Sequence, residues 1–101
     1  MEKVFAYGTL LQPDVQQNVF NRVLVGIPSS IRGYEVCTVV IDGEEYPSLR
    51  ESHTAEVKGE IFTLTDEELQ RADVYEGVEY TRKRILTEHK EECWVYSTFF
   101  S

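Results

Sequence analysis

The stretch VKGEIFTLTDEELQRADVYEG, residues 57–77, decides the fold class because its hydrophobic period changes partway along. From Val57 to Leu64 the residues alternate as they do in a half-buried β-strand. Thr65 then has the form of a helix N-cap, and Glu68, three residues later, completes a capping box. The stretch therefore predicts a strand followed directly by a helix.

The sequence also predicts where that helix begins and ends. Leu64 and Leu69 occupy the two positions of a hydrophobic staple, which fixes how the chain enters the helix. We expect the helix to run to about Glu76, with Gly77 as its left-handed C-terminal cap.

Upstream of this stretch, the sequence predicts one buried strand and one helix. Val4-Phe5-Ala6-Tyr7 is a short apolar run typical of a strand that is buried on both faces. Pro13 suits the first turn of a helix, which should end before Gly26. Three valines recur at helical spacing: Val15, Val19 and Val23.

The middle of the chain predicts further strands. Residues 30–41 are rich in β-branched and aromatic types, with Gly33 as a bend or bulge. Asp42-Gly43 is a turn signal. Residues 46–49 predict only a short extended piece, because Pro47 cannot donate to a central ladder.

After the second helix, the sequence predicts a final hairpin. Its strands are Tyr80–Thr87 and Cys93–Phe99, joined by a polar turn around Lys90. Hairpin-linked strands pair antiparallel, so residues 1–101 predict one α+β domain. Closure of the sheet into a small, mostly antiparallel β-barrel with two flanking helices would remove exposed edges, but periodicity alone does not prove closure.

Composition excludes several classes of partner. The formal net charge is −8, which disfavours nucleic acid and anionic membranes. No apolar run approaches the ~20 residues of a membrane-spanning helix, and the first residues lack the pattern of a signal peptide, so we expect a cytoplasmic protein. A solvated strand face explains the basic cluster Arg82-Lys83-Arg84 as well as a binding role does.

No metal or cofactor motif is visible. His53 and His89 lack metal-ligand spacing and are expected at the surface, whereas Cys37 and Cys93 are expected as buried thiols. Neither dinucleotide-binding nor phosphate-loop glycine patterns occur. We therefore expect chemistry that needs no cofactor.

Two acidic residues in the second helix are anomalous. Leu69 and Ala72 mark its inward stripe, and Glu76 points almost the same way, with Asp73 modestly off it. Each carboxylate could be satisfied structurally, by backbone amides or an arginine. Glu76 could also act chemically, because burial at a helix C-terminus raises a carboxyl pKa towards neutrality, where proton transfer is efficient.

The turn Tyr7-Gly8-Thr9-Leu10 lies between the first strand and the first helix. Glycine lets the backbone approach a ligand closely, and successive free N–H groups can cradle an anion. By itself such a turn is a weak signal, found in many proteins that bind nothing there.

Four segments together carry a family resemblance. They are Val4–Leu10, Tyr46–Leu49, Val57–Phe62 and Asp73–Arg82. In this order and spacing the chain resembles the γ-glutamyl cyclotransferase-like superfamily, and most closely its small bacterial members and the γ-glutamylamine cyclotransferase branch. Ala72 stands where a leucine is common, and we expect the chain to lack the C-terminal segments that some relatives place over the cavity, so the substrate stays open.

The resemblance implies a small barrel enzyme that needs no cofactor or metal. Its substrate would be a γ-glutamylamine or γ-glutamyl-amino acid, and its products 5-oxoproline and a free amine. Glu76 would be the general acid/base. The residues expected to bind the substrate or support the cavity are Tyr7, Gly8, Thr9, Leu10, Tyr80 and Arg82.

Two other interpretations remain at this point. On the same barrel, the chain could be a non-catalytic module that binds an amine or an amino-acid derivative, with Glu76 only recognising it. It could also be purely structural, with Asp73 and Glu76 satisfied by Arg82 or Arg84. The sequence leaves the oligomeric state open.

Overall fold

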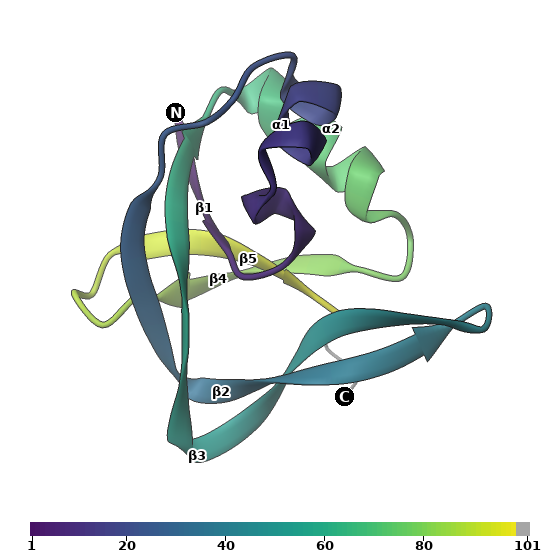
Figure 1. Ribbon diagram of the computed structural model, residues 1–101. Helices are drawn as coiled ribbons and strands as arrows, with labels where there is room; N and C mark the ends of the chain where they lie inside the picture. Colours follow the sequence, from purple (N-terminus) through teal and green to yellow (C-terminus); the bar gives the residue numbers. More distant parts are fainter. Residues whose placement is uncertain (99–101) are drawn as a thin grey trace.

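A computed structural model describes residues 1–98 as five strands, two α-helices and a short 3₁₀ turn (Figure 1). In chain order these elements are β1 (Glu2–Ala6), the 3₁₀ turn η1 (Thr9–Leu11), α1 (Pro13–Phe20), β2 (Ile27–Ile41), β3 (Glu44–Leu64), α2 (Asp66–Glu76), β4 (Thr81–Leu86) and β5 (Glu92–Ser97). The predicted α+β class is confirmed. Phe99, the last residue of the predicted final strand, lies outside the described residues.

The strands form one mixed sheet in the order β2-β3-β1-β5-β4. All pairings are antiparallel except that of β1 with β5, which is parallel through Val4 and Trp94. The long β2–β3 hairpin bends, so the sheet curls into a half-barrel, with α1 and α2 packed against each other beside it (Figure 1). Within residues 1–98 the sheet does not close into a complete barrel.

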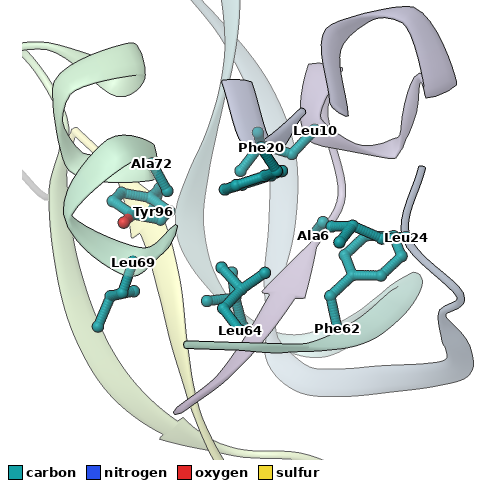
Figure 2. Close-up of a cluster of buried hydrophobic side chains, with 10 residues drawn as sticks. Ala6, Leu10, Phe20, Leu24, Phe62, Leu64, Leu69, Ala72 and Tyr96 are labelled. Atoms are coloured by element: carbon teal, nitrogen blue, oxygen red, sulfur yellow. The ribbon is translucent and has the colours of Figure 1, made fainter. Parts of the chain in front are cut away.

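Alternating residues of the central strands supply two hydrophobic clusters. Val4 and Ala6 of β1 belong to the cluster that also receives the helices, whereas Phe5 belongs to the other cluster. β1 is therefore buried on both faces, as its apolar run predicted. Figure 2 shows the first cluster, in which Leu69 and Ala72 of α2 lie with Leu64 and Tyr96 of the sheet.

The start of α2 has the predicted geometry. The Thr65 hydroxyl accepts a hydrogen bond from the Glu68 N–H at 3.1 Å, and Glu68 Oε1 accepts one from the Thr65 N–H at 3.0 Å. Leu64 and Leu69, the staple residues, are both buried. Arg22 adds two bonds to the Glu68 carboxylate, and they lower the pKa of Glu68 to about 2.

Three local predictions need correction. α1 ends at Phe20, with Asn21 in the left-handed conformation, so Val23 lies outside the helix and is more than half exposed. β3 is one continuous strand through Pro47, where only β2 pairs with it. Gly77 has the positive φ of +81° that favours glycine, but its ψ of −175° is extended and so is not that of a left-handed helical cap.

The turns agree with the sequence. A bulge falls between Arg32 and Tyr34 at Gly33, and Asp42-Gly43 forms the tight β2–β3 turn with positive φ at both residues. Lys90 also has positive φ, within the β4–β5 turn. Neither of the helices in residues 1–98 has the length and apolar content needed to span a bilayer.

Candidate active site

A cavity of about 240 Å³ opens between the turn after β1 and the C-terminal end of α2. Its lining is mainly aromatic and apolar. The lining residues are Phe5, Ala6, Tyr7, Gly8, Thr9, Leu10, Tyr46, Pro47, Tyr75, Glu76, Tyr80 and Tyr96. Glu76 is the sole charged side chain among them, so any charge chemistry within the cavity centres on that carboxyl group.

Glu76 is held in the last turn of α2, half-buried in the cavity wall. Burial raises its pKa to about 7. Within residues 1–98 no side chain donates a hydrogen bond to its carboxylate or forms an ion pair with it. A carboxyl group in these surroundings exchanges a proton readily near neutral pH.

The turn after β1 lines the same cavity as this carboxyl and has backbone N–H groups outside its own hydrogen bonds. The first hydrogen bond of η1 runs from the Leu11 N–H to the Gly8 carbonyl. The N–H groups of Gly8, Thr9 and Leu10 therefore precede the first internal bond of the turn, as at any helix start. At Gly8 a Cβ atom would lie 3.3 Å from Cγ of Pro47, so glycine lets the turn approach the opposite wall closely.

Tyrosine hydroxyls fix the walls of the cavity to one another. Tyr7 donates to the Tyr96 carbonyl at 2.7 Å, and Tyr80 donates to the Pro47 carbonyl at 2.5 Å. The hydroxyls of Thr9 and Tyr75 are 2.8 Å apart, which links the turn to α2. Burial raises the pKa of Tyr7, and it raises the pKa of Tyr80 to about 12, so both phenols stay protonated at neutral pH.

Asp73 and Arg82 lie behind the cavity wall. Asp73 Oδ1 accepts a hydrogen bond from Arg82 Nε at 2.8 Å and another from the Tyr96 hydroxyl at 2.6 Å. The Arg82 guanidinium also stacks 4.3 Å from the centre of the Trp94 ring, and Arg84 stacks 4.4 Å from it. Arg82 therefore contacts the carboxylate of Asp73 and does not line the cavity.

The structure brings together six of the seven residues predicted for the site. Glu76, Tyr80 and the whole turn from Tyr7 to Leu10 line the cavity, and Arg82 lies in the layer behind them. Tyr46, Tyr75 and Tyr96 also line the cavity, and none of them was predicted as a site residue. Tyr46 and Tyr75 fall inside the segments that carry the family resemblance, and that resemblance could have indicated them. Tyr96 lies in β5 and reaches the cavity through the pairing of that strand.

The half-barrel with its two helices is a fold shared with γ-glutamyl cyclotransferase-like structures. Residues 4–99 match the family described as "Gamma-glutamyl cyclotransferase, AIG2-like", and the chain belongs to that family. The more specific γ-glutamylamine branch is not distinguished by this match.

Curated relatives from Arabidopsis thaliana agree with this assignment. AIG2-like protein C is 32% identical over 91% of this chain and 55% of its own length. Protein AIG2 C is 34% identical over 81% of this chain and 49% of its own length. The chain spans about half the length of the curated relatives it matches.

Solved structures share the fold. A solution structure of an Arabidopsis thaliana protein has a TM-score of 0.76 and 28% identity, covering 95% of this chain and 67% of that one. A structure described as gamma-glutamyl cyclotransferase has a TM-score of 0.72 over 95% of this chain and 65% of that one. Its 17% identity supports a common fold only.

Proposed function

We propose that the chain converts a γ-glutamyl amide to 5-oxoproline and a free amine, with Glu76 as general acid/base. One observation carries the proposal: among the cavity-lining residues of the described part of the chain, Glu76 is the sole charged side chain, and burial raises its pKa to about 7. The family to which the chain belongs supports the reaction class. The substrate is a γ-glutamylamine or a γ-glutamyl-amino acid.

The reaction supplies its own nucleophile. The α-amino nitrogen of the substrate attacks the γ-carbonyl carbon, a five-membered lactam closes, and the bond from that carbon to the leaving nitrogen breaks. The attacking nitrogen gives up two protons in total, and the leaving nitrogen takes up two to depart as an ammonium ion. A carboxyl group with a pKa near 7 can accept and return such protons, which is typically worth roughly 10² to 10⁴ in rate.

The rest of the cavity would bind and orient the substrate. In this proposal the N–H groups of Gly8, Thr9 and Leu10 hold an anionic part of it, either its α-carboxylate or the developing oxyanion. The rings of Tyr7 and Tyr80 enclose the glutamyl chain and keep it curled, which brings the amine close to the carbonyl carbon. No protein nucleophile or cofactor is required.

The test is release of 5-oxoproline from a panel of γ-glutamyl amides by the wild-type chain and by Glu76→Gln. Gln keeps the shape of the side chain but cannot take a proton, so we expect turnover to fall by roughly 10²-fold or more. Glu79→Gln is the matched control, because Glu79 is an exposed glutamate just beyond α2 that does not line the cavity.

Two results would count against the proposal. If Glu76→Gln kept wild-type turnover, Glu76 would not be the acid/base. If no γ-glutamyl amide were turned over while free amines bound in a Glu76-dependent way, the chain would be a binding module instead.

A further inference from the structure

The C-terminal turn of α2, residues 73–76, carries Glu76 but has no buried apolar residue. The buried side chains of α2, Glu68, Leu69 and Ala72, all lie earlier in the helix. Beyond them, Val74 is 82% exposed and Tyr75 is 40% exposed. Hydrophobic burial therefore fixes the first two turns of the helix and not the turn that carries the candidate catalytic group.

Hydrogen bonds of Asp73 attach this last turn of α2 to the sheet. Its Oδ1 atom accepts from Arg82 on β4 at 2.8 Å and from the Tyr96 hydroxyl on β5 at 2.6 Å, so one oxygen ties the helix end to two strands. Figure 2 shows the Tyr96 ring beside α2, within the first hydrophobic cluster. Hydrogen bonds to charged groups are stronger than neutral ones, and two that diverge from one atom also fix direction.

The partners of Asp73 are themselves fixed. The Arg82 guanidinium stacks on the Trp94 ring, and Trp94 pairs with Val4 of β1 in the sheet. Tyr96 is buried and lines the cavity, and its carbonyl oxygen accepts a hydrogen bond from the Tyr7 hydroxyl. The contacts thus run from the centre of the sheet to the helix end.

We propose that Asp73 is a positioning residue, which clamps the last turn of α2 to β4 and β5 and so holds the Glu76 carboxyl in the cavity. The proposal rests on the proposed role of Glu76, one helical turn further along the same face. Asp73 does not line the cavity, so it acts through Tyr96 and through the orientation of the helix end.

The clamp has a consequence for proton affinity that can be measured. The titratable groups that line the cavity with Glu76 are the phenols of Tyr7, Tyr46, Tyr80 and Tyr96 from the packed elements and that of Tyr75 on its own helix, and the charged pair of Asp73 and Arg82 lies behind the wall. Loss of Asp73 removes a nearby anion and leaves the Arg82 guanidinium without its carboxylate partner. Both changes favour the ionised form of Glu76, so we expect its pKa to fall towards the ordinary value of 4.5.

The experiment compares Asp73→Ala, Asp73→Asn and the control Glu67→Gln. Glu67 is an exposed carboxylate on the same helix, paired with Arg71, away from the cavity. For Asp73→Ala we expect kcat to fall at least about tenfold with a smaller change in KM, and the acid limb of the pH–rate profile to move to lower pH. Asp73→Asn keeps an acceptor oxygen, so it should lie between Asp73→Ala and the wild type.

Carboxyl NMR titration of Glu76 measures the clamp without turnover. The Glu76 pKa should fall in Asp73→Ala and stay unchanged in Glu67→Gln. A thermal melt of each variant establishes that it is folded. If Asp73→Ala lowered only the melting temperature, with the Glu76 pKa and the shape of the pH–rate profile unchanged, the positioning role would be refuted. A chain that turns over nothing, yet shows the pKa change, would refute the proposed reaction and keep the clamp.

Discussion

At the scale of single residues, Asp73 and Glu76 show how surroundings give two like groups different properties. Both are carboxylates on one face of α2, a turn apart. One carboxylate oxygen of Asp73 accepts hydrogen bonds from a guanidinium and a phenol, whereas Glu76 faces a cavity lined by neutral aromatic rings. The helical wheel placed both inward, but their partners lie on β4 and β5, so only the tertiary fold decides which carboxylate is paired.

The raised pKa of Glu76 has a cost in stability that depends on pH. In the unfolded chain the carboxyl titrates near 4.5, and in the folded chain near 7. Between these values the folded state binds more protons, so the stability of the wild type falls as pH rises, by at most roughly 3 kcal/mol in total, and then levels off. Glu76→Gln lacks this loss.

Urea unfolding between about pH 4 and pH 8 tests this expectation. We expect the free energy of unfolding of Glu76→Gln, minus that of the wild type, to rise from about pH 4.5 to about pH 7 and to stay level above that. The exposed Glu79→Gln variant should give a nearly flat difference. A flat difference for Glu76→Gln as well would show that its carboxyl titrates normally in the folded chain.

At the scale of elements, the entry into α2 is the segment whose sequence and structure agree best. Its signals are local: a cap, a reciprocal glutamate and a staple, all within six residues, 64–69. The bulge at Gly33 and the turn at Asp42-Gly43 were predictable for the same reason. Their backbones have positive φ, a conformation that glycine and aspartate adopt more readily than most residues.

The elements whose bounds were predicted less accurately depend on contacts between residues far apart in the sequence. The valine spacing extended α1 to Val23, but the chain leaves the helix at Asn21 and runs on to Leu24, which is buried and whose N–H donates to the Gln16 side chain. Pro47 suggested a break in β3. The strand continues because beside Pro47 it pairs with β2 alone, and β1 pairs only with residues 60–64.

The cap of α2 can be tested by substitution. In Thr65→Ala the N–H of Glu68 loses its acceptor, and we expect the free energy of unfolding to fall by about 1 kcal/mol. The midpoint of urea unfolding should move while its slope stays constant. Thr65→Ser keeps the hydroxyl and should stay within a few tenths of a kcal/mol of the wild type. Equal losses in both variants would mean that the cap bond contributes nothing.

At the scale of the whole molecule, the cavity is assembled from parts far apart in the sequence. The turn after β1, the Tyr46-Pro47 segment of β3, the end of α2 and Tyr96 of β5 each supply one wall. The sequence could indicate the turn and Glu76 because each has a local anomaly. Local pattern could not indicate the half-barrel geometry, because the pairing of β1 with both β3 and β5 follows from strand order, and only the family resemblance implied a small barrel.

Net charge also acts at this scale. The chain carries a formal charge of −8, and within residues 1–98 no cationic residue lines the cavity to offset it. At about 10 mM ionic strength the screening length is ~30 Å, comparable to the molecule, and at about 150 mM it is ~8 Å. In low salt, therefore, the field of the whole protein attracts a cationic substrate and repels an anionic one.

Three γ-glutamyl amides of different charge measure this field directly, given the proposed reaction. γ-Glutamylalanine carries a net negative charge, the butylamide is neutral overall, and the mono-amide of 1,4-diaminobutane is positive. From about 10 to about 150 mM salt, kcat/KM should rise about two- to threefold for the first, stay constant for the second and fall by a similar factor for the third. The neutral amide is the internal control, since its response reports any effect of salt on the enzyme itself. Equal salt dependence for all three would mean that substrate encounter depends on the local donors of the turn after β1 and not on the charge of the whole molecule.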